Sequence, residues 1–282
     1  MALNRKTRKK RPRIISLAPS LDITPSLGRK RFKSLVLHLL TSLKPIPGLN
    51  GGWRLKKITL VIPAYNEENR IKKASERFIS SHVLSEKCRF LFIVDGNDRT
   101  YEILEGIRQD NPEKEIQVKK YPERLGKGGA VGEGIKAAKT DYVGFLDVDI
   151  SLPIEKIEDI VQIILKEEPD CSIGKRKRVE GAPILRKLSS RIFNIIVNLL
   201  FGLGISDTQC GCKFFKRKLV YPGEEQVFMI KGFAFDVELL KKIKEMGGEI
   251  TEYEIMGKWE GGKFSILESP KMLLDLIRLR FF

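Results

Sequence analysis

Two carboxylates one residue apart, Asp147 and Asp149, follow directly after the apolar run 142–146. A short apolar run with aromatic and β-branched residues is typical of a strand buried in a parallel sheet. Side chains at positions i and i+2 of a strand point to the same side, so both carboxylates could bind one metal ion or one metal-bound phosphate. The same residues could instead cap a helix that begins near Pro153, with Asp149 or Ser151 as its N-cap. Spacing alone leaves both interpretations open.

Turn and polar residues also follow two other predicted strands. In open α/β sheets, ligands bind beyond the carboxyl ends of the parallel strands. We therefore expect these residues to meet the two carboxylates at one edge of a sheet, in an arrangement that suits a nucleotide. They are Pro63, Ala64, Tyr65 and Glu67 after the first predicted strand and Asp95 after the second.

A glycine-rich segment, Gly-Lys-Gly-Gly at residues 126–129, stands at the predicted start of a helix. Backbone amides at a helix N-terminus, together with the cation of Lys127, suit the charge of a phosphate. The spacing of a Walker loop is missing, and no dinucleotide-binding glycine pattern follows the first predicted strand. Alone, the segment is a weak signal, because Lys127 could be an ordinary solvated lysine.

From residue 57 onward the chain alternates between predicted strands and predicted helices. Such alternation predicts an α/β fold with a mostly parallel, Rossmann-like sheet flanked by helices. The predicted strands are 56–63, 88–95, 115–121, 141–147, 170–174, 209–216 and 249–256, and the predicted helices are 66–81, 99–109, 126–139, 154–166, 184–204, 234–246 and 271–279.

Residues 1–56 form a basic N-terminal extension that holds most of the net charge of +16 and has a single acid, Asp22. Its composition predicts a partly disordered segment. Within it, residues 31–44 carry apolar side chains at helical spacing with basic residues at both ends. This pattern predicts an amphipathic helix that lies on a membrane surface or packs on the domain. The charge by itself suits anionic lipid and nucleic acid equally well.

The cysteines and the apolar runs exclude some classes of protein. Cys88, Cys171, Cys210 and Cys212 lack zinc-site spacing, so we expect reduced, buried thiols of a cytosolic protein. The longest uncharged run, 192–206, is shorter than the ~20 residues of a membrane helix, and we find no secretory signal. Membrane attachment is therefore expected to be peripheral.

Taken together and in this order, VIPAYNEE, IVDGNDRT, RLGKGGAV and FLDVDISLP resemble the inverting family 2 glycosyltransferases of the GT-A fold. The resemblance covers the nucleotide half, roughly residues 57–149. It implies that Asp149 ligates Mg²⁺ or Mn²⁺ on the diphosphate of a nucleotide sugar, and that Asp147 contacts either the nucleotide or the same metal. The nucleotide-sugar residues that it implies are Pro63, Ala64, Tyr65, Glu67, Asp95, Lys127, Asp147 and Val148.

The second half of the chain, with GISDTQCGCKFF, GFAFDVELL, KWEGGKFS and MLLDLIRLRFF, resembles the dolichyl-phosphate β-glucosyltransferases. The dolichyl-phosphate mannose synthases share part of this pattern. The resemblance implies transfer of a hexose, glucose from UDP-glucose, to dolichyl or polyprenyl phosphate with inversion. The same reaction with GDP-mannose is the alternative.

Cations followed by an apolar helix are what a polyprenyl phosphate needs, because the phosphate requires charge pairing and the chain requires an apolar track. The helix 184–204 follows several cations and becomes apolar toward its end, although it could equally be a core helix flanked by surface cations. The segment 270–282 is a basic amphipathic end that suits anionic headgroups. The candidate acceptor-phosphate residues are Arg176, Arg186, Arg191, Asp207 and Gln209.

Three residues are the candidates for catalysis: Asp149, Lys127 and Asp236. Lys127 and the metal at Asp149 would stabilise the charge of the leaving diphosphate. Asp236 would position or deprotonate the acceptor, although it could instead be the N-cap of its helix. A phosphomonoester is already anionic near neutral pH, so it needs a general base less than a sugar hydroxyl does.

These observations predict a peripheral enzyme at the cytoplasmic face of a membrane, with no nucleic-acid partner. The alternative of another class is a catalytically silent, basic membrane- or RNA-binding protein built on the same fold. The carboxylate pair and the Gly-Lys segment favour the enzyme, because a binding protein would not need both.

Overall fold

The computed structural model describes residues 58–149, 152–180, 183–223, 226–258 and 269–281. The chain divides into the units Met1–Trp53 and Arg54–Phe282, and all of the described residues belong to the second unit. The predicted basic extension, with its helix at 31–44, lies outside the described residues. The side chains of residues 177–180, 185–187, 256–258 and 269 also lie outside them.

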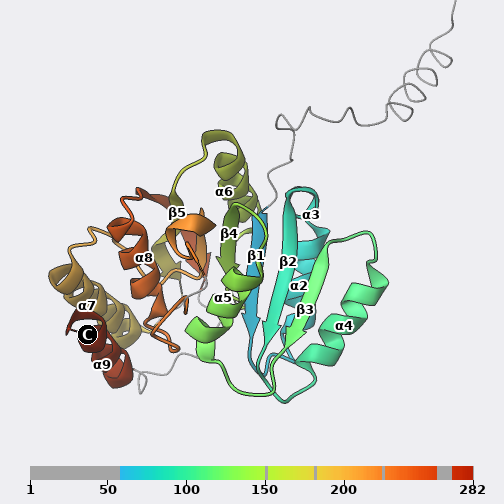
Figure 1. Cartoon of the computed structure of the whole chain (residues 1–282), viewed down its shortest axis with the longest axis horizontal. Coiled ribbons are helices and arrows are strands. Elements are labelled where there is room, and N and C mark those ends of the chain that lie inside the picture. The colour runs from blue at the N-terminus through green and yellow to red at the C-terminus, as the bar shows by residue number, and fades with distance from the viewer. Residues whose placement is uncertain (1–57, 150–151, 181–182, 224–225, 259–268, 282) are drawn as a thin grey trace, which may run out of the picture. The chain divides into compact units, whose positions relative to one another are not determined.

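One seven-stranded sheet runs through this unit in the order β3-β2-β1-β4-β6-β5-β7 (Figure 1). Neighbouring strands are parallel except at β6, which is antiparallel to both β4 and β5. The predicted α/β class with a mostly parallel sheet is therefore confirmed. The strands are β1 (Ile58–Ala64), β2 (Cys88–Val94), β3 (Ile116–Lys120), β4 (Tyr142–Leu146), β5 (Cys171–Glu180), β6 (Cys212–Lys216) and β7 (Ile250–Lys258).

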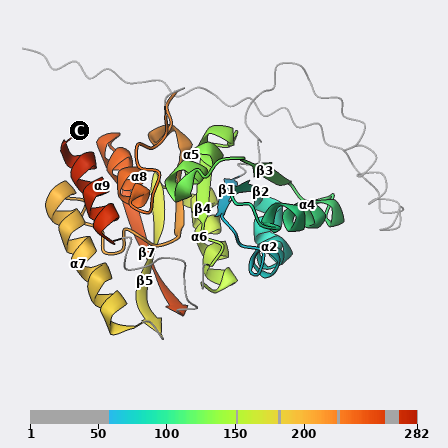
Figure 2. The same ribbon diagram turned by 90° about the horizontal axis from the view of Figure 1, so that it is seen from below.

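Helices cover both faces of the sheet (Figure 2). Apolar residues of α5, α7, α8 and α9 pack on one face, and those of α2, α3, α4 and α6 pack on the other. The helices are α2 (Ile71–Ser80), α3 (His82–Lys87), α4 (Thr100–Asp110), α5 (Gly126–Ala137), α6 (Ile154–Glu167), α7 (Ile184–Phe201), α8 (Phe235–Glu245) and α9 (Ser269–Phe281), with a short 3₁₀ turn at Arg217–Leu219.

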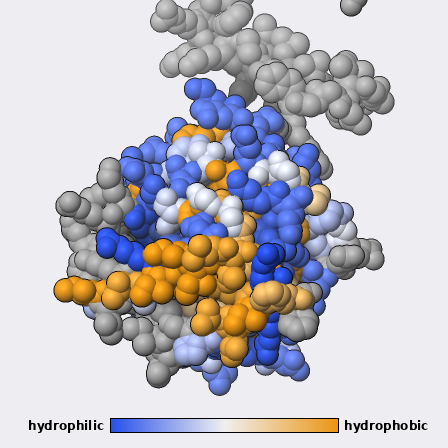
Figure 3. All heavy atoms as spheres, turned by 90° about the vertical axis from the view of Figure 1, so that its left-hand side faces the viewer, coloured by the Kyte–Doolittle hydropathy of each residue, from blue (hydrophilic) through white to orange (hydrophobic). Residues whose placement is uncertain are grey.

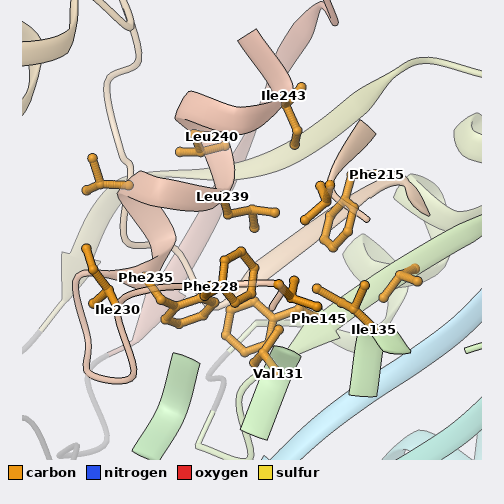
Figure 4. Close-up of a cluster of buried hydrophobic side chains, with 14 of the residues drawn as sticks. Val131, Ile135, Phe145, Phe215, Phe228, Ile230, Phe235, Leu239, Leu240 and Ile243 are labelled. Atoms are coloured by element: carbon orange, nitrogen blue, oxygen red, sulfur yellow. The ribbon is translucent and has the colours of Figure 1, made fainter. Parts of the chain in front are cut away.

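Aromatic packing fixes the start of α8 over the end of β4. The ring of Phe145 on β4 meets Phe235 of α8 edge to face, with centroids 5.5 Å apart, and Phe228 packs on Phe235 at 5.4 Å. Figure 4 shows these rings between the aliphatic side chains of α5 and those of α8. Edge-to-face pairs contribute about 0.5–1.5 kcal/mol beyond the burial of their area. This packing brings the first turn of α8 to the ligand edge of the sheet.

Most boundaries lie within three residues of the predicted ones, and three differences are larger. α2 begins at Ile71 rather than at 66, because the backbone N–H of Glu67 donates to Thr100 Oγ1 and residues 66–70 form a turn. β5 has ten residues rather than the predicted five, because it pairs with β7 along its whole length despite its basic sequence. The short helix α3 was not predicted.

The predicted state of the thiols is confirmed, since Cys88, Cys171, Cys210 and Cys212 are free and buried. None of the helices within the described ranges combines the length and the apolar character that crossing a bilayer requires.

Gly144 in the middle of β4 provides a test of the packing between strands. A Cβ at this position would lie 2.5 Å from Phe214 Cε1 and 2.6 Å from Leu60 Cδ2. We expect Gly144→Ala to lower the free energy of unfolding by about 1–3 kcal/mol, the usual cost of overpacking. Urea denaturation measures this change. The control is Gly106→Ala in α4, where nothing lies within 4 Å of the new Cβ; an equal loss in both variants would contradict the prediction.

Candidate active site

The two carboxylates after β4 share one strong cation. Lys127 Nζ, from the first turn of α5, lies 3.0 Å from each carboxylate oxygen of Asp147. Burial raises the pKa of Asp149, and the charge of Asp147 raises it further, so the two acids are close enough to repel each other. Arg70 Nη1 lies 3.9 Å from Asp149 Oδ2. The predicted proximity of Lys127 to the carboxylate pair is therefore observed.

The alternative in which Asp149 is the N-cap of the next helix is wrong, because the N-cap of α6 is Pro153. Ser151, the other predicted cap, lies outside the described residues.

Aromatic rings surround the ammonium group of Lys127. Its Nζ lies 5.1 Å from the ring centroid of Phe145, 5.7 Å from that of Phe233 and 5.9 Å from that of Phe235. Burial alone would lower the pKa of Lys127, but the charges of Asp147 and Asp236 outweigh burial and raise it. Lys127 therefore remains a cation in a low-dielectric site, where its charge acts strongly on an anionic ligand.

The backbone amides at the start of α5 have a role other than the predicted one. Asp95 Oδ2 accepts from the N–H groups of Leu125 and Gly126 at 2.9 and 3.0 Å, and the N–H of Gly128 donates to Lys231 O at 2.9 Å. These three amides are thus satisfied within the chain. The prediction that these amides bind a phosphate is therefore wrong for the amides of Leu125, Gly126 and Gly128. The side chain of Lys127 is the group at this helix start that would contact a phosphate.

The glycines of this segment permit a close backbone approach. Gly126 has φ +73°, and a Cβ at Gly128 would collide with Ile230 O and would lie 2.6 Å from Phe235 Cβ. Any side chain here would push the segment before α8 away from α5. The glycines therefore place α8 beside Lys127.

The residues after β1 form the predicted turn at the same edge. Tyr65 is exposed, and the guanidinium of Arg124 stacks on its ring at 3.4 Å from the centroid. Glu67 holds Arg70 through two hydrogen bonds of 2.9 and 3.2 Å. Ala64 and Val148 are buried in the core, so a ligand could meet only their backbone. Pro63, the remaining predicted nucleotide residue, is half-buried in β1.

Two of the predicted acceptor residues, Arg176 and Asp207, bind each other. Arg176 Nε and Nη2 donate to the carboxylate of Asp207 at 2.7 and 2.8 Å, next to a β-bulge in β5. Burial alone would lower the pKa of Arg176, but Asp207 and, to a smaller extent, Asp147 hold it above its ordinary value. The Arg176–Asp207 pair therefore interacts electrostatically with the carboxylate after β4.

The other predicted acceptor residues are more dispersed. Gln209 donates to Phe233 O at the long distance of 3.5 Å. Arg191 lies exposed on α7, and the side chain of Arg186 lies outside the described residues.

Two asparagines of α7 hold the segment that carries Asp207. Asn194 Oδ1 accepts from Thr208 Oγ1 at 2.7 Å, and its amide donates to Ser206 O at 2.7 Å. Asn198 binds the backbone of residues 204 and 205 through both its oxygen and its nitrogen. These contacts fix the position of Asp207 relative to α7.

Asp236 occupies the first turn of α8 and forms a buried ion pair. Lys213 Nζ donates to Asp236 Oδ1 at 2.6 Å. The alternative in which Asp236 is the N-cap is wrong, because Ala234 is the N-cap and α8 has no side-chain cap.

Sequence reasoning missed four residues that shape the site. The backbone oxygen of Gly211 accepts from the N–H of Asp147 at 3.0 Å, and a Cβ on Gly211 would collide with Asp147 Oδ2. For Lys213, a lysine next to the apolar residues in the interior of a predicted strand was a visible signal. The four residues are Arg70, Arg124, Gly211 and Lys213.

The Arg176–Asp207 pair leads to a prediction about stability and pH. Asp207→Asn leaves the half-buried Arg176 without its counter-charge. We therefore expect the free energy of unfolding at pH 7 to fall by about 2–4 kcal/mol, between the cost of breaking an exposed pair and that of breaking a buried one. Burial alone would raise the pKa of Asp207, but the hydrogen bonds and charge of Arg176 hold it below 3.8. The stabilisation is therefore full above that pH and is lost as the pH falls below it.

Denaturation of both proteins at a series of pH values tests this prediction. The matched control is Asp159→Asn, which removes the exposed pair with Lys156 and should cost about 1 kcal/mol or less. A pH-independent difference between wild type and Asp207→Asn would contradict it.

Comparison with known proteins agrees with this geometry. The family model described as "Glycosyl transferase family 2" matches residues 59–242. A dolichyl-phosphate beta-glucosyltransferase of Dictyostelium discoideum is 28% identical over 249 residues, which cover 79% of this chain and 74% of that protein. An undecaprenyl-phosphate 4-deoxy-4-formamido-L-arabinose transferase of Yersinia enterocolitica is 24% identical over 226 residues, covering 79% and 67%.

A solved structure shares the fold. Glucosyl-3-phosphoglycerate synthase from Mycobacterium tuberculosis, in complex with Mn²⁺, UDP-glucose and phosphoglyceric acid, aligns with a TM-score of 0.58 and 17% identity, covering 79% of each chain. The resemblance inferred from the sequence motifs is thus confirmed: the chain belongs to glycosyltransferase family 2 and is a glycosyltransferase with the GT-A fold.

Proposed function

We propose that this chain transfers glucose from UDP-glucose to dolichyl phosphate or a related polyprenyl phosphate, with inversion, at a membrane surface. The observation that carries the proposal is the position of the Arg176–Asp207 pair. The segment of Asp207 ends at Gly211, whose backbone oxygen accepts from the N–H of Asp147 at 3.0 Å, and α7 holds the same segment through Asn194. A phosphate bound there would lie between the nucleotide edge of the sheet and an apolar helix.

On the donor side, Asp149 and Asp147 are the residues that would hold Mg²⁺ or Mn²⁺. Within the described ranges no further His, Cys, Asp or Glu completes a cluster of three. Two carboxylates nevertheless fit, because Mg²⁺ is usually bound by one or two carboxylates together with substrate phosphates and water. When bound, the ion would neutralise charge on the leaving diphosphate. Lys127 adds a fixed cation for the same diphosphate from the start of α5.

On the acceptor side, the nucleophile brings its own charge. A phosphomonoester is ionised near neutral pH, so the reaction does not need Asp236 to take a proton from it. Asp236 is 1% exposed and paired with Lys213, so it would orient the acceptor indirectly, by fixing the first turn of α8. Arg176 Nε and Nη2 bind Asp207, so the opposite edge of the guanidinium, formed by Nη1 and the second N–H of Nη2, is the one that would meet a phosphate. Orientation alone can supply a large part of a rate enhancement, because it replaces a bimolecular encounter by a preset geometry.

The polyprenyl chain and the membrane would meet an exposed apolar surface on α7 and α9. Figure 3 shows this face, where hydrophobic side chains form a continuous band. The opposite side of α7 packs on the core through Val197, so the helix is neither wholly buried nor wholly exposed. Exposed cations on the same helices, Arg191, Arg278 and Arg280, suit anionic headgroups. The apolar surface consists of Ile184, Leu188, Ile192, Ile195, Leu199, Leu273, Leu274, Ile277 and Phe281.

The relatives support this assignment of acceptor and donor. Those from Dictyostelium and Yersinia are named for dolichyl-phosphate and undecaprenyl-phosphate chemistry, and the mycobacterial structure contains UDP-glucose and Mn²⁺.

A donor panel tests the reaction. The full chain is incubated with polyprenyl phosphate, Mg²⁺ or Mn²⁺, and radiolabelled UDP-glucose or GDP-mannose, and label in the lipid fraction is counted. We expect transfer from UDP-glucose. Transfer from GDP-mannose alone would show that GDP-mannose, and not UDP-glucose, is the donor. Transfer from neither nucleotide sugar would overturn the proposal.

The carboxylate pair is tested in the same assay. Asp149→Asn should reduce transfer roughly a hundredfold or more while the protein stays folded, because it removes a charge needed at the diphosphate. Circular dichroism checks the fold. Asp110→Asn, an exposed acid at the end of α4, is the matched control and should behave as the wild type. Full activity of Asp149→Asn would contradict the proposal that Asp149 holds a metal ion needed for transfer.

The membrane surface is tested by flotation with vesicles that contain anionic lipid. Ile195→Glu/Leu199→Glu places two charges on side chains that are 59% and 81% exposed, and it should abolish flotation. Met246→Glu, at a side chain that is 53% exposed and lies away from α7 and α9, is the control. High ionic strength in all samples screens the basic N-terminal residues. Equal flotation of the double variant and the control would contradict the assignment of this surface.

A further inference from the structure

Lys213 is a fully buried lysine in the middle of the sheet. It lies in β6, opposite Phe145 of β4 and Ile173 of β5, and its exposed fraction is 0%. Lysine is almost never fully buried unless it is paired, and a hydrophobic residue at such a position is often at least as stabilising as an ion pair. The need for a packed core therefore does not explain why a lysine occupies this position.

The ammonium group of Lys213 joins two segments of the active site. Nζ donates to Asp236 Oδ1 at 2.6 Å and to the backbone oxygen of Cys210 at 2.5 Å. Asp236 begins α8, where the acceptor is proposed to bind. Cys210 precedes Gly211, whose backbone oxygen accepts a hydrogen bond from the N–H of Asp147. A Cβ on Gly211 would collide with the carboxylate of Asp147. One cation thus holds both the acceptor side and the donor side of the site.

Lys213 also belongs to a compact arrangement of alternating charge. Its Nζ and that of Lys127 lie 5.8 and 5.1 Å from the ring centroid of Phe145. Lys127 pairs with Asp147, and Lys213 pairs with Asp236. Removal of Lys213 would leave the buried Asp236 only partly compensated, and removal of Lys127 would do the same to the half-buried Asp147.

We infer that Lys213 is a positioning residue for the transfer reaction, which acts by holding Asp236 and the backbone at Cys210–Gly211 in place beside Asp147. The inference rests on the proposed function, because it assumes that Asp236 orients the acceptor.

The charged groups around Asp236 give this role a measurable signature. Burial raises the pKa of Asp236, whereas Lys213 and then Lys127 lower it, and Asp147 raises it slightly. Without the charge of Lys213, the pKa of Asp236 would rise further, so the carboxylate would be ionised only at higher pH. A lysine that only stabilised the fold would leave the pH dependence of turnover unchanged.

The test compares Lys213→Gln and Lys213→Met with the wild-type full chain in the lipid-transfer assay. Gln keeps a hydrogen-bond donor without the charge, and Met keeps the volume without either. We expect kcat at neutral pH to fall roughly tenfold or more in both variants, because small displacements of a positioned group are costly. Because Lys213 also holds the backbone beside Asp147, the KM for the nucleotide sugar should rise, but by a smaller factor than kcat falls, and activity should recover in part as the pH rises. The matched control is Lys216→Met on the same strand, which removes the half-buried pair with Asp170 and should leave kcat and its pH profile unchanged.

Folded variants with wild-type kcat and an unshifted pH profile would overturn the inference, since Lys213 would then serve stability alone. Failure of both variants to fold, by circular dichroism and nucleotide binding, would overturn it in the same way. A wild-type chain that transfers no hexose would instead overturn the proposed function, so the two failures are distinguishable.

Discussion

The ion pair between Lys127 and Asp147 is the interaction on which the rest of the site depends. It joins the first turn of α5 to the residue that follows β4, the next element along the chain. The centroids of three aromatic rings lie 5.1, 5.7 and 5.9 Å from its ammonium group, and the two side chains are only 19% and 21% exposed, so its charges are less screened than those of a surface pair. The other groups of the site lie around this pair. Asp149 is two residues after Asp147, Gly211 contacts the carboxylate of Asp147, and the charge of Asp236 on α8 acts on Lys127.

The frame that holds this pair is built from close contacts that only small residues permit. Gly128 lets the segment before α8 touch α5, and Gly211 lets β6 approach the carboxylate of Asp147. Because β6 runs antiparallel to β4 on one side and to β5 on the other, it connects the nucleotide half of the sheet with the half that carries Arg176. The antiparallel strand thus unites donor and acceptor residues in one sheet.

Apart from the short helix α3, the elements after residue 57 could be predicted from the sequence, because their apolar runs and helical periods are strong and are separated by turn residues. The grouping of Lys127 with Asp147 could also be predicted, since both follow from the rule that ligands meet the carboxyl ends of parallel strands. The partners of individual polar groups could not. Asp95 and Lys231 lie far in sequence from the amides that they satisfy, and Lys213 is separated from Asp236 by 23 residues. Such pairings arise from tertiary packing, which local patterns do not encode.

The asparagines of α7 have a consequence for how deeply this helix could enter a bilayer. An unpaired amide is costly in hydrocarbon, yet Asn194 and Asn198 direct their hydrogen bonds to residues 204–208. The backbone of residues 204–208 therefore satisfies the polar side chains on one side of α7. The other side of the helix exposes apolar side chains. A helix of this kind would lie along the interface rather than pass through it, and its depth would set the height of the Arg176–Asp207 pair above the lipid.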